Sequence, residues 1–182
     1  MLILASQSPR RRQLLQMVGL DFECIPADIE EVVPEGTPAK EIPRLLALQK
    51  ASAVLKDHPD AVVIGSDTVV AIDGTVLGKP KDEADALRML KQLSGRTHTV
   101  HTGVAILSKD KQVSFTSSTK VTFYDHTEEE LLAYIRTGDP MDKAGAYGIQ
   151  GVGAFLTERI EGDFYTVMGL PVAEVLRQLK QF

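Results

Sequence analysis

Short runs of apolar residues alternate along the chain with segments whose apolar residues recur every three or four positions. Continuous, β-branched runs are typical of buried strands, and the periodic segments are typical of amphipathic helices. The runs predict strands at residues 2–5, 21–25, 61–65, 68–72, 75–77, 97–107 and 113–123. The periodic segments predict helices at about residues 9–18, 39–55, 82–93, 127–137 and from 171 onward. The residues from Thr127 to Glu130 have the pattern of a capping box at the start of the fourth helix.

Turn signals show how these strands pair. Asp73-Gly74 is the strongest hairpin signal in the chain, and a charged turn at 108–111 joins the two longest strands. A further hairpin is predicted through residues 161–163. Hairpins require antiparallel pairs, whereas the alternation of strands and helices favours parallel ones. The predicted fold class is therefore α/β, with a mixed β-sheet flanked by helices.

The first predicted helix begins with a concentration of positive charge. Ser8 can cap this helix and Pro9 suits its first position, which places residues 10–12, all arginine, in the first turn. Each exposed cation there should cost on the order of 0.3–1 kcal/mol, because a helix N-terminus already carries partial positive charge. Free backbone N–H groups, serine hydroxyls and guanidinium groups all suit phosphate oxygens. The pattern favours an anion site, and a patch of solvated arginines is the alternative.

A carboxylate, Asp67, lies at the end of the apolar run at 61–65, one serine further on. Burying an unpaired carboxylate is costly, so we expect Asp67 to meet a cation, a metal or a hydrogen-bond network. Strand ends in α/β sheets are also where ligands bind. An aspartate that only caps a turn is the alternative. Further along, Lys79 lies between a glycine and a proline, although its spacing alone favours an ordinary lysine at the exit of a hairpin.

A third segment, residues 142–153, is rich in glycine and alanine. Small residues let the backbone approach a ligand or another strand closely. Within this segment, Tyr147 and Gln150 could offer a ring face and an amide to a nucleobase, and a simple tight loop is the alternative. The segment matches neither a Walker loop nor a dinucleotide-binding fingerprint.

Composition narrows the choice of function. The 182 residues suffice for one domain, of one or two lobes, and the 43% of hydrophobic residues is ordinary for a soluble protein. A net charge of −5 argues against a general nucleic-acid binder. No stretch is long enough to span a membrane, the single cysteine excludes an internal disulfide, and the apolar run precedes its basic cluster, the reverse of a secretory signal. We therefore expect a cytoplasmic protein without nucleic-acid or membrane partners.

The histidines offer no clear metal site. His98 and His101 lie three positions apart on a predicted strand, so their side chains face opposite sides of it. We therefore interpret both as structural residues.

Taken together, three ordered motifs resemble the Maf family of nucleoside triphosphate pyrophosphatases. They are Ser6-Gln7-Ser8-Pro9-Arg10-Arg11, Gly65-Ser66-Asp67-Thr68 with Lys79-Pro80, and Asp142-Lys143-Ala144-Gly145-Ala146-Tyr147-Gly148-Ile149-Gln150-Gly151. The resemblance covers nearly the whole chain and implies a single Maf-like domain, 1–182. It also implies an elongated, ITPase-like mixed sheet with a cleft between two lobes, and a homodimer. The implied reaction cleaves a nucleoside triphosphate between its α- and β-phosphates, giving a monophosphate and pyrophosphate.

The resemblance also implies roles for particular residues. Asp67 matches the family's proton acceptor, and Glu31 with Asp67 could hold a divalent cation, Mg²⁺ or Mn²⁺; Asp82 is a weaker candidate. Because an aspartate carboxylate is a weak base at neutral pH, a metal that acidifies the attacking water would be needed. The positions that match the triphosphate-binding residues are Ser6, Arg10, Arg11, Lys50 and Lys79. The helical pattern around Lys50 would by itself predict a solvated side chain.

Substrate preference follows from three further matches. Arg10, Thr68 and Gln150 match the triad that marks the subgroup resembling dTTP/UTP pyrophosphatases. The amide of Gln150 offers a donor and an acceptor to the imide edge of uracil or thymine. Modified pyrimidine triphosphates are further candidate substrates, which would make the protein a cleanser of the nucleotide pool. The competing hypothesis is a nucleotide-binding regulator of septum formation that acts through a protein partner.

Overall fold

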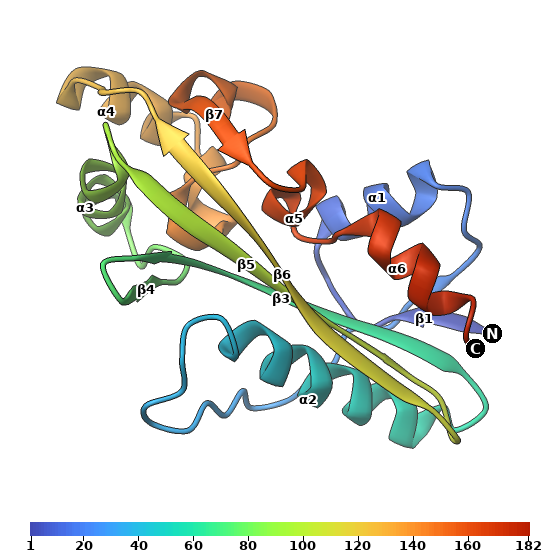
Figure 1. The fold of residues 1–182 in the computed structure, drawn as a ribbon. Coiled ribbons are helices and arrows are strands. Elements are labelled where there is room, and N and C mark those ends of the chain that lie inside the picture. Colours follow the sequence, from blue (N-terminus) through green and yellow to red (C-terminus); the bar gives the residue numbers. More distant parts are fainter. The chain divides into compact units, whose positions relative to one another are not determined.

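A seven-stranded mixed β-sheet organises the computed structural model, which describes residues 1–182 (Figure 1). The strands are β1 (Leu2–Leu4), β2 (Glu23–Cys24), β3 (Val62–Ile72), β4 (Thr75–Leu77), β5 (Thr97–Leu107), β6 (Gln112–Phe123) and β7 (Thr157–Glu161). Their order is β2-β1-β3-β5-β6-β7, and β4 pairs with β3. β1 is parallel to β2 and β3, whereas β4 and β7 are antiparallel to their partners. The predicted mixed α/β fold is confirmed.

Helices flank the sheet, and their caps agree with the sequence signals. The α-helices are α1 (Pro9–Met17), α2 (Ile42–Asp57), α3 (Glu83–Leu93), α4 (Glu128–Arg136), α5 (Phe164–Met168) and α6 (Val172–Leu179). Short 3-10 segments lie at Asp139–Asp142, Ala144–Ala146 and Gly151–Leu156. Ser8 caps α1, and Thr127 forms the predicted reciprocal capping box with Glu130 at the start of α4.

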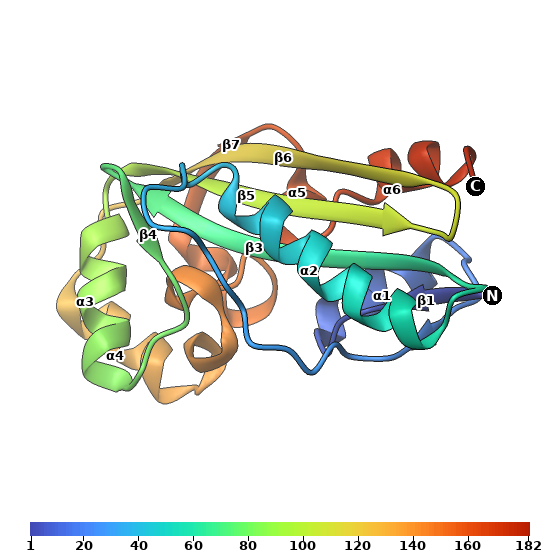
Figure 2. The same cartoon turned by 90° about the horizontal axis from the view of Figure 1, so that it is seen from below.

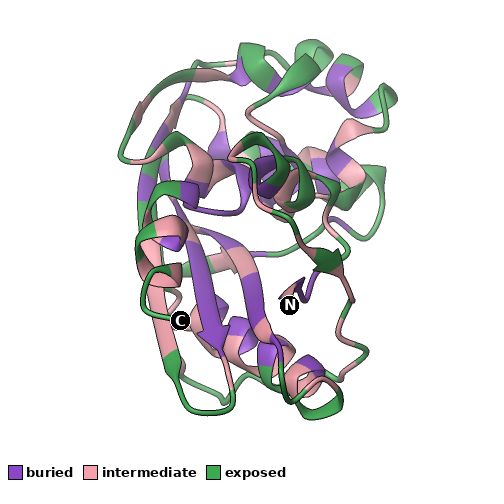
Figure 3. Ribbon diagram, turned by 90° about the vertical axis from the view of Figure 1, so that its right-hand side faces the viewer, coloured by how far each residue is buried: buried purple, intermediate pink, exposed green.

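The chain divides into two compact units. The first comprises residues 1–68, 102–117 and 169–182, and the second comprises residues 69–101 and 118–168. Strands β3, β5 and β6 contribute residues to both units. Buried residues concentrate on the strands, while the helices alternate between buried and exposed positions (Figure 3).

In the first unit, helices cover both faces of the sheet. α2 lies across one face of β3 and β5, and α1 and α6 lie on the other (Figures 1 and 2). The core beneath α2 includes Ile3, Ala47, Val63 and Ala105, all essentially inaccessible to solvent. The chain leaves β1 through α1 to reach β2, and then crosses through α2 to β3 on the other side of β1. Open α/β sheets bind their ligands beyond the carboxyl ends of such parallel strands.

The second unit has its own core. Buried side chains from β3, α3, β6 and α4 pack together there, among them Val70, Leu90, Phe123 and Leu131. The amphipathic helix predicted here, α3, supplies Ala86, Met89, Leu90 and Leu93 to this core. The pattern places Met89 and Leu90 on the apolar side correctly, whereas Ala84, which it also places there, is exposed. A core of this size explains why residues 69–101 and 118–168 form a compact unit.

The Asp73-Gly74 hairpin is confirmed between β3 and β4. Both residues have positive φ, 51° and 73°, as the two central residues of a type I′ turn require. By contrast, the chain does not break before Thr68: β3 runs without interruption from Val62 to Ile72. Asp67 therefore lies within a strand and not at the end of one.

The hairpin predicted through residues 161–163 is wrong. β7 ends at Glu161, and α5 begins at Phe164. The carboxylate of Asp163 accepts hydrogen bonds from the backbone N–H and the hydroxyl of Thr166, at 2.6 and 2.8 Å, so the acidic turn signal is the start of a helix. Gly162, at φ 130°, makes the turn against Thr119.

None of the helices is both long enough and apolar enough to cross a membrane.

Candidate active site

The basic start of α1 is built around Ser6, which is buried two residues after the end of β1. The Ser6 hydroxyl accepts a hydrogen bond from the backbone N–H of Ser8 at 3.2 Å, and the Ser8 hydroxyl accepts one from the N–H of Arg11 at 3.5 Å. This turn fixes where the arginines leave the helix. Arg10 and Arg11 are half-buried, and Arg12 is exposed.

The protein holds the Arg11 guanidinium by three of its five N–H groups. Nε donates to the carbonyl of Gly169 at 2.7 Å, Nη1 to the hydroxyl of Ser6 at 3.3 Å, and Nη2 to the hydroxyl of Thr68 at 3.0 Å. One N–H on each terminal nitrogen is left for a ligand. Burial lowers the pKa of the Arg11 guanidinium, and the negative charge of Asp67 offsets part of that effect. Arginine remains charged at neutral pH under such conditions, so a fixed cation results.

Other groups brace these anchors in turn. Gly169 adopts φ 116°, a conformation that favours glycine, and a Cβ there would lie 3.4 Å from Nε of Arg11. The buried hydroxyl of Ser66 lies 3.1 Å from the Gly169 carbonyl, and the hydroxyl of Thr68 lies 2.9 Å from that of Thr102. The position of Arg11 in the first turn of a helix was predicted from the sequence. The contacts of Ser66 and Thr102 were not predicted.

Glycines bring α2 close to the sheet. A Cβ on Gly65 of β3 would lie 2.2 Å from the carbonyl oxygen of Ala47, and a Cβ on Gly103 of β5 would lie 2.2 Å from the backbone nitrogen of Arg44. No side chain fits at either position without moving the helix. The close approach places the middle of α2, with Lys50, directly over β3.

Lys50 forms ion pairs with two carboxylates. Its Nζ lies 2.6 Å from Oδ1 of Asp67 and 2.9 Å from Oε1 of Glu31. The side chains of Lys50 and Asp67 are only 17% and 16% exposed, whereas that of Glu31 is 47% exposed. The expectation that Asp67 meets a cation is confirmed. The pattern-based expectation of a solvated Lys50 is wrong, because α2 packs too closely on the sheet for that lysine to reach bulk water freely.

Gln49, the neighbour of Lys50, holds the loop that carries Glu31. Its side-chain amide donates to the carbonyl of Val32 at 2.6 Å, and its oxygen accepts from the N–H of Val32 at 3.1 Å. The amide of Gln49 thus bonds to both the N–H and the carbonyl of one residue, as a neighbouring strand would, and fixes the loop against α2. Nothing in the sequence pattern singled out Gln49.

The residues present suit a divalent cation that is held only partly by protein. No three His, Cys, Asp or Glu side chains come together as a set that could hold a metal ion. Glu31 and Asp67 share a cationic neighbour and supply hard oxygen donors. Asp82, the weaker candidate, caps α3 by accepting a hydrogen bond from the N–H of Asp85 at 2.8 Å. Mg²⁺ is commonly held in this way, by one or two carboxylates with substrate phosphates and water.

Two predicted site residues, Lys79 and Gln150, belong to the second unit and are exposed there. The backbone near them is tied together, because the carbonyl of Gly78 accepts a hydrogen bond from the N–H of Gly145 at 3.0 Å. Their roles in binding stay predictions.

Tyr147 is not available as a ring face for a base. Its side chain is buried, its hydroxyl lies 2.7 Å from Nε2 of His98, and its ring packs edge-on against Phe123. His101 instead pairs with the hydroxyl of Ser118, so the two histidines have separate structural partners. The expectation of a nucleobase contact by Tyr147 is therefore wrong: the aromatic residue completes the core beneath the glycine-rich segment.

A polar network that the sequence did not reveal holds this segment. The Tyr134 hydroxyl donates to the carboxylate of Asp139 at 2.5 Å and accepts from the N–H of Gly148 at 3.1 Å. The Lys143 ammonium donates to the carboxylates of Asp139 and Asp142, at 3.1 and 2.9 Å. Burial raises the pKa of Tyr134, so its hydroxyl stays a donor. The network fixes the backbone on both sides of the glycines.

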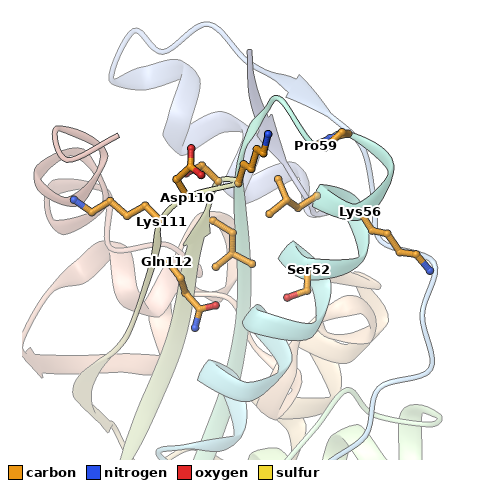
Figure 4. Close-up of a pocket in the computed structure, with 10 residues that line it drawn as sticks. Ser52, Lys56, Pro59, Asp110, Lys111 and Gln112 are labelled. Carbon is orange, nitrogen blue, oxygen red and sulfur yellow. The ribbon is translucent and has the colours of Figure 1, made fainter.

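A hollow of about 490 Å³ lies elsewhere in the first unit, between the end of α2 and the β5–β6 turn (Figure 4). It is lined by Ser52, Leu55, Lys56, Pro59, Leu107, Ser108, Lys109, Asp110, Lys111 and Gln112. None of the predicted site residues lines it, and Lys56 points away from it.

The fold and these side chains define a class: an α/β protein with a fixed arginine at a helix start and a carboxylate–lysine cluster whose aspartate lies within a central strand. Such an arrangement suits a phosphorylated ligand. A family model described as Maf-like protein matches residues 1–182, and the chain belongs to this family.

Similar proteins agree with this assignment. A dTTP/UTP pyrophosphatase of Bacillus cytotoxicus is 52% identical over 99% of this chain and 94% of its own length. A dTTP/UTP pyrophosphatase of Bacillus cereus is 51% identical over 100% of this chain and 95% of its own length. Among solved structures, Ham1 proteins share the fold.

The Ham1 protein of Staphylococcus aureus has a TM-score of 0.53 at 17% identity and covers 84% of this chain and 77% of its own. The Ham1 protein of Coxiella burnetii has a TM-score of 0.54 at 15% identity and covers 99% and 96%. At these identities the likeness concerns the fold alone.

Proposed function

We propose that this protein hydrolyses nucleoside triphosphates, dTTP and UTP among them, between the α- and β-phosphates, releasing a nucleoside monophosphate and pyrophosphate. The family membership and the full-length relatives at 52% and 51% identity support this function. One structural observation carries the argument: a guanidinium with two uncommitted N–H groups lies within electrostatic reach of both Asp67 and Glu31.

The triphosphate is held by cations and a hydroxyl. Arg11 presents one N–H from each terminal nitrogen, the geometry that suits two oxygens of one phosphate group. In this proposal the remaining phosphate-binding groups are Ser6, Arg10, Lys50 and Lys79. Because Arg11 is anchored before the ligand arrives, little conformational entropy is lost when the phosphate binds.

Asp67 receives the proton of the attacking water. Its carboxylate is mostly buried on β3 and is oriented by the bond from Lys50. A divalent cation, Mg²⁺ or Mn²⁺, held by Glu31 and Asp67, would lower the pKa of water and neutralise phosphate charge. Lys50, free to exchange a carboxylate for a phosphate oxygen, then keeps the negative charges of enzyme and substrate balanced.

Substrate choice involves Arg10, Thr68 and Gln150. The hydroxyl of Thr68 is already bonded to Arg11 and close to Thr102, so we infer that Thr68 acts through the arginine and not by direct contact with the base. Gln150 is exposed in the second unit and carries an amide suited to the imide edge of uracil or thymine. Modified uracil and thymine nucleotides that retain the imide carry the same edge, which supports a role in cleansing the nucleotide pool.

Incubation with UTP and Mg²⁺, followed by separate detection of pyrophosphate and orthophosphate, tests this function. We expect pyrophosphate from the unmodified protein and a loss of roughly 10²-fold or more in kcat for Asp67→Asn, because the proton acceptor is removed. Asp60→Asn, which changes an exposed aspartate outside the site, is the matched control and should keep full activity. Orthophosphate as the product, or an active Asp67→Asn variant, would contradict the mechanism.

A regulator of septation that only binds a nucleotide is not favoured by the relatives, which are named as pyrophosphatases. It would also gain nothing from a carboxylate beside a polyphosphate. Calorimetry that showed tight UTP binding by the unmodified protein without product formation would favour the regulator over the pyrophosphatase. The proposal further includes a homodimer in the cytoplasm, in keeping with the family resemblance.

A further inference from the structure

The ammonium group of Lys50 occupies the position that a shared cation would take between Glu31 and Asp67. Its Nζ is 2.6 Å from one carboxylate and 2.9 Å from the other, and all three side chains come from different segments of the first unit. The lysine thus does for these oxygens in the free protein what a metal ion would do.

Lys50 and a divalent cation compete for the same oxygens. Mg²⁺ lies about 2.0–2.1 Å from its oxygen ligands. An ion that bridged Asp67 and Glu31 would therefore touch an ammonium group left in its present place. Two positive charges at such a separation repel strongly in a partly buried site. A divalent cation can bind this pair only if the Lys50 ammonium moves away.

The surroundings let the ammonium move while the helix stays. Gly65 and Gly103 fix the backbone of α2 against the sheet, so a shift of the helix is costly. A lysine side chain, in contrast, has a flexible four-carbon stem that can redirect its charge. Moving Lys50 without a new partner would leave Asp67 unpaired and mostly buried, which costs free energy. A new anion for the lysine and a new cation for the carboxylates are therefore needed together.

We propose that Lys50 keeps the Glu31–Asp67 pair closed to divalent cations in the free protein, and that a bound polyphosphate opens the pair by drawing the lysine onto its own oxygens. The identity of the anion rests on the proposed function, but the competition between lysine and metal does not. The metal therefore binds with the nucleotide and not before it. The two ligands are positively coupled, so each strengthens the binding of the other by the same factor.

Binding of Mn²⁺ to the full chain without nucleotide, measured by electron paramagnetic resonance, tests this proposal. Lys50→Met removes the ammonium group and keeps most of the unbranched side chain, and we expect it to bind Mn²⁺ roughly tenfold more tightly than the unmodified protein. The double variant Lys50→Met/Asp67→Asn should lose this gain, because the carboxylate itself is the ligand. Lys56→Met changes an exposed lysine in the last turn of the same helix and should match the unmodified protein.

Equal Mn²⁺ affinity in the Lys50→Met and unmodified proteins would overturn the proposal, as would a gain that survives Asp67→Asn. Circular dichroism checks that each variant is folded, and Lys50→Gln gives a second neutral side chain should the methionine variant unfold. The proposed function is judged separately, by pyrophosphate release from the unmodified protein. A failure of one is therefore distinguishable from a failure of the other.

Discussion

Arg11 shows how much of this site depends on individual hydrogen bonds. Its guanidinium has three protein acceptors, one of them the carbonyl of Gly169, which lies 158 positions away along the chain. An arginine anchored in this way presents its remaining donors in one orientation. An arginine without anchors would have to lose rotamer freedom on binding, at about 0.5–1.5 kcal/mol.

Replacing Thr68 by valine tests that anchoring. Thr68→Val removes the acceptor for Nη2 of Arg11 and the contact with Thr102, while it preserves shape. We expect kcat/KM for UTP to fall roughly tenfold, the equivalent of one lost charge-assisted hydrogen bond. Thr68→Ser, which keeps the hydroxyl, should restore most of the activity. Loss in both variants would indicate that the methyl group matters and not the bond to Arg11.

At the scale of elements, the distance between α2 and the sheet decides where Lys50 lies. Gly65 and Gly103 allow contacts of backbone on backbone that any side chain would prevent. The sequence predicted both the helix and the strands. A glycine within a strand, however, does not indicate which segment packs against it. The contact explains why Lys50, in the middle of α2, lies beside the carboxylate of Asp67.

Gly65→Ala should therefore be destabilising and should also lower activity. Its Cβ would lie 2.2 Å from the Ala47 carbonyl oxygen, so α2 must move, and overpacking of this kind costs about 1–3 kcal/mol. Urea unfolding measures the change in stability, and UTP hydrolysis measures the displacement of Lys50. Gly78→Ala, where nothing lies within 4 Å of the added Cβ, is the control and should leave the urea midpoint unchanged.

Strand β5 carries a buried histidine that makes stability depend on pH. Burial lowers the pKa of His98 from its usual 6.5 to about 4, so the folded protein keeps it neutral where the unfolded chain already binds a proton. Stability is therefore highest above pH 6.5 and falls as the pH drops toward 4. With about 1.36 kcal/mol for each pKa unit, the loss by pH 5 is about 2 kcal/mol.

Urea unfolding at pH 7 and pH 5 checks this expectation. His98→Gln keeps a polar partner for the Tyr147 hydroxyl and does not titrate, so it should flatten the dependence on pH between these values. His58→Gln, which changes a less buried histidine in a turn, should retain the dependence. An equal slope in the His98→Gln and unmodified proteins would show that another group is responsible.

At the scale of the whole molecule, the mixed sheet combines two kinds of connection. The parallel strands β1, β2 and β3 are linked through helices, and the hairpins add antiparallel strands that extend into the second unit. All of the close contacts around Arg11, Lys50 and Asp67 lie within the first unit. The candidate phosphate-binding residues Ser6, Arg10, Arg11 and Lys50 thus all belong to one compact unit, and Lys79 and Gln150 belong to the other.

The sequence by itself determined the local features. The cap and the arginines of α1, the Asp73-Gly74 turn, the capping box of α4 and the periodicity of α3 depend on neighbouring residues, so their patterns could be recognised along the chain. Three motifs likewise indicated the Maf family, which the comparisons confirmed.

Only the tertiary structure decided which distant groups meet. Asp67 lies inside the continuous strand β3 and pairs with Lys50 of α2. The carbonyl of Gly169 accepts a hydrogen bond from Arg11, and Tyr147 is buried in the core. These contacts join segments that are far apart in sequence. Local propensity contains no information about such contacts, because each depends on how closely a helix or a turn approaches the sheet. The chemical character of each residue could be predicted from the sequence, whereas its partners were determined by packing.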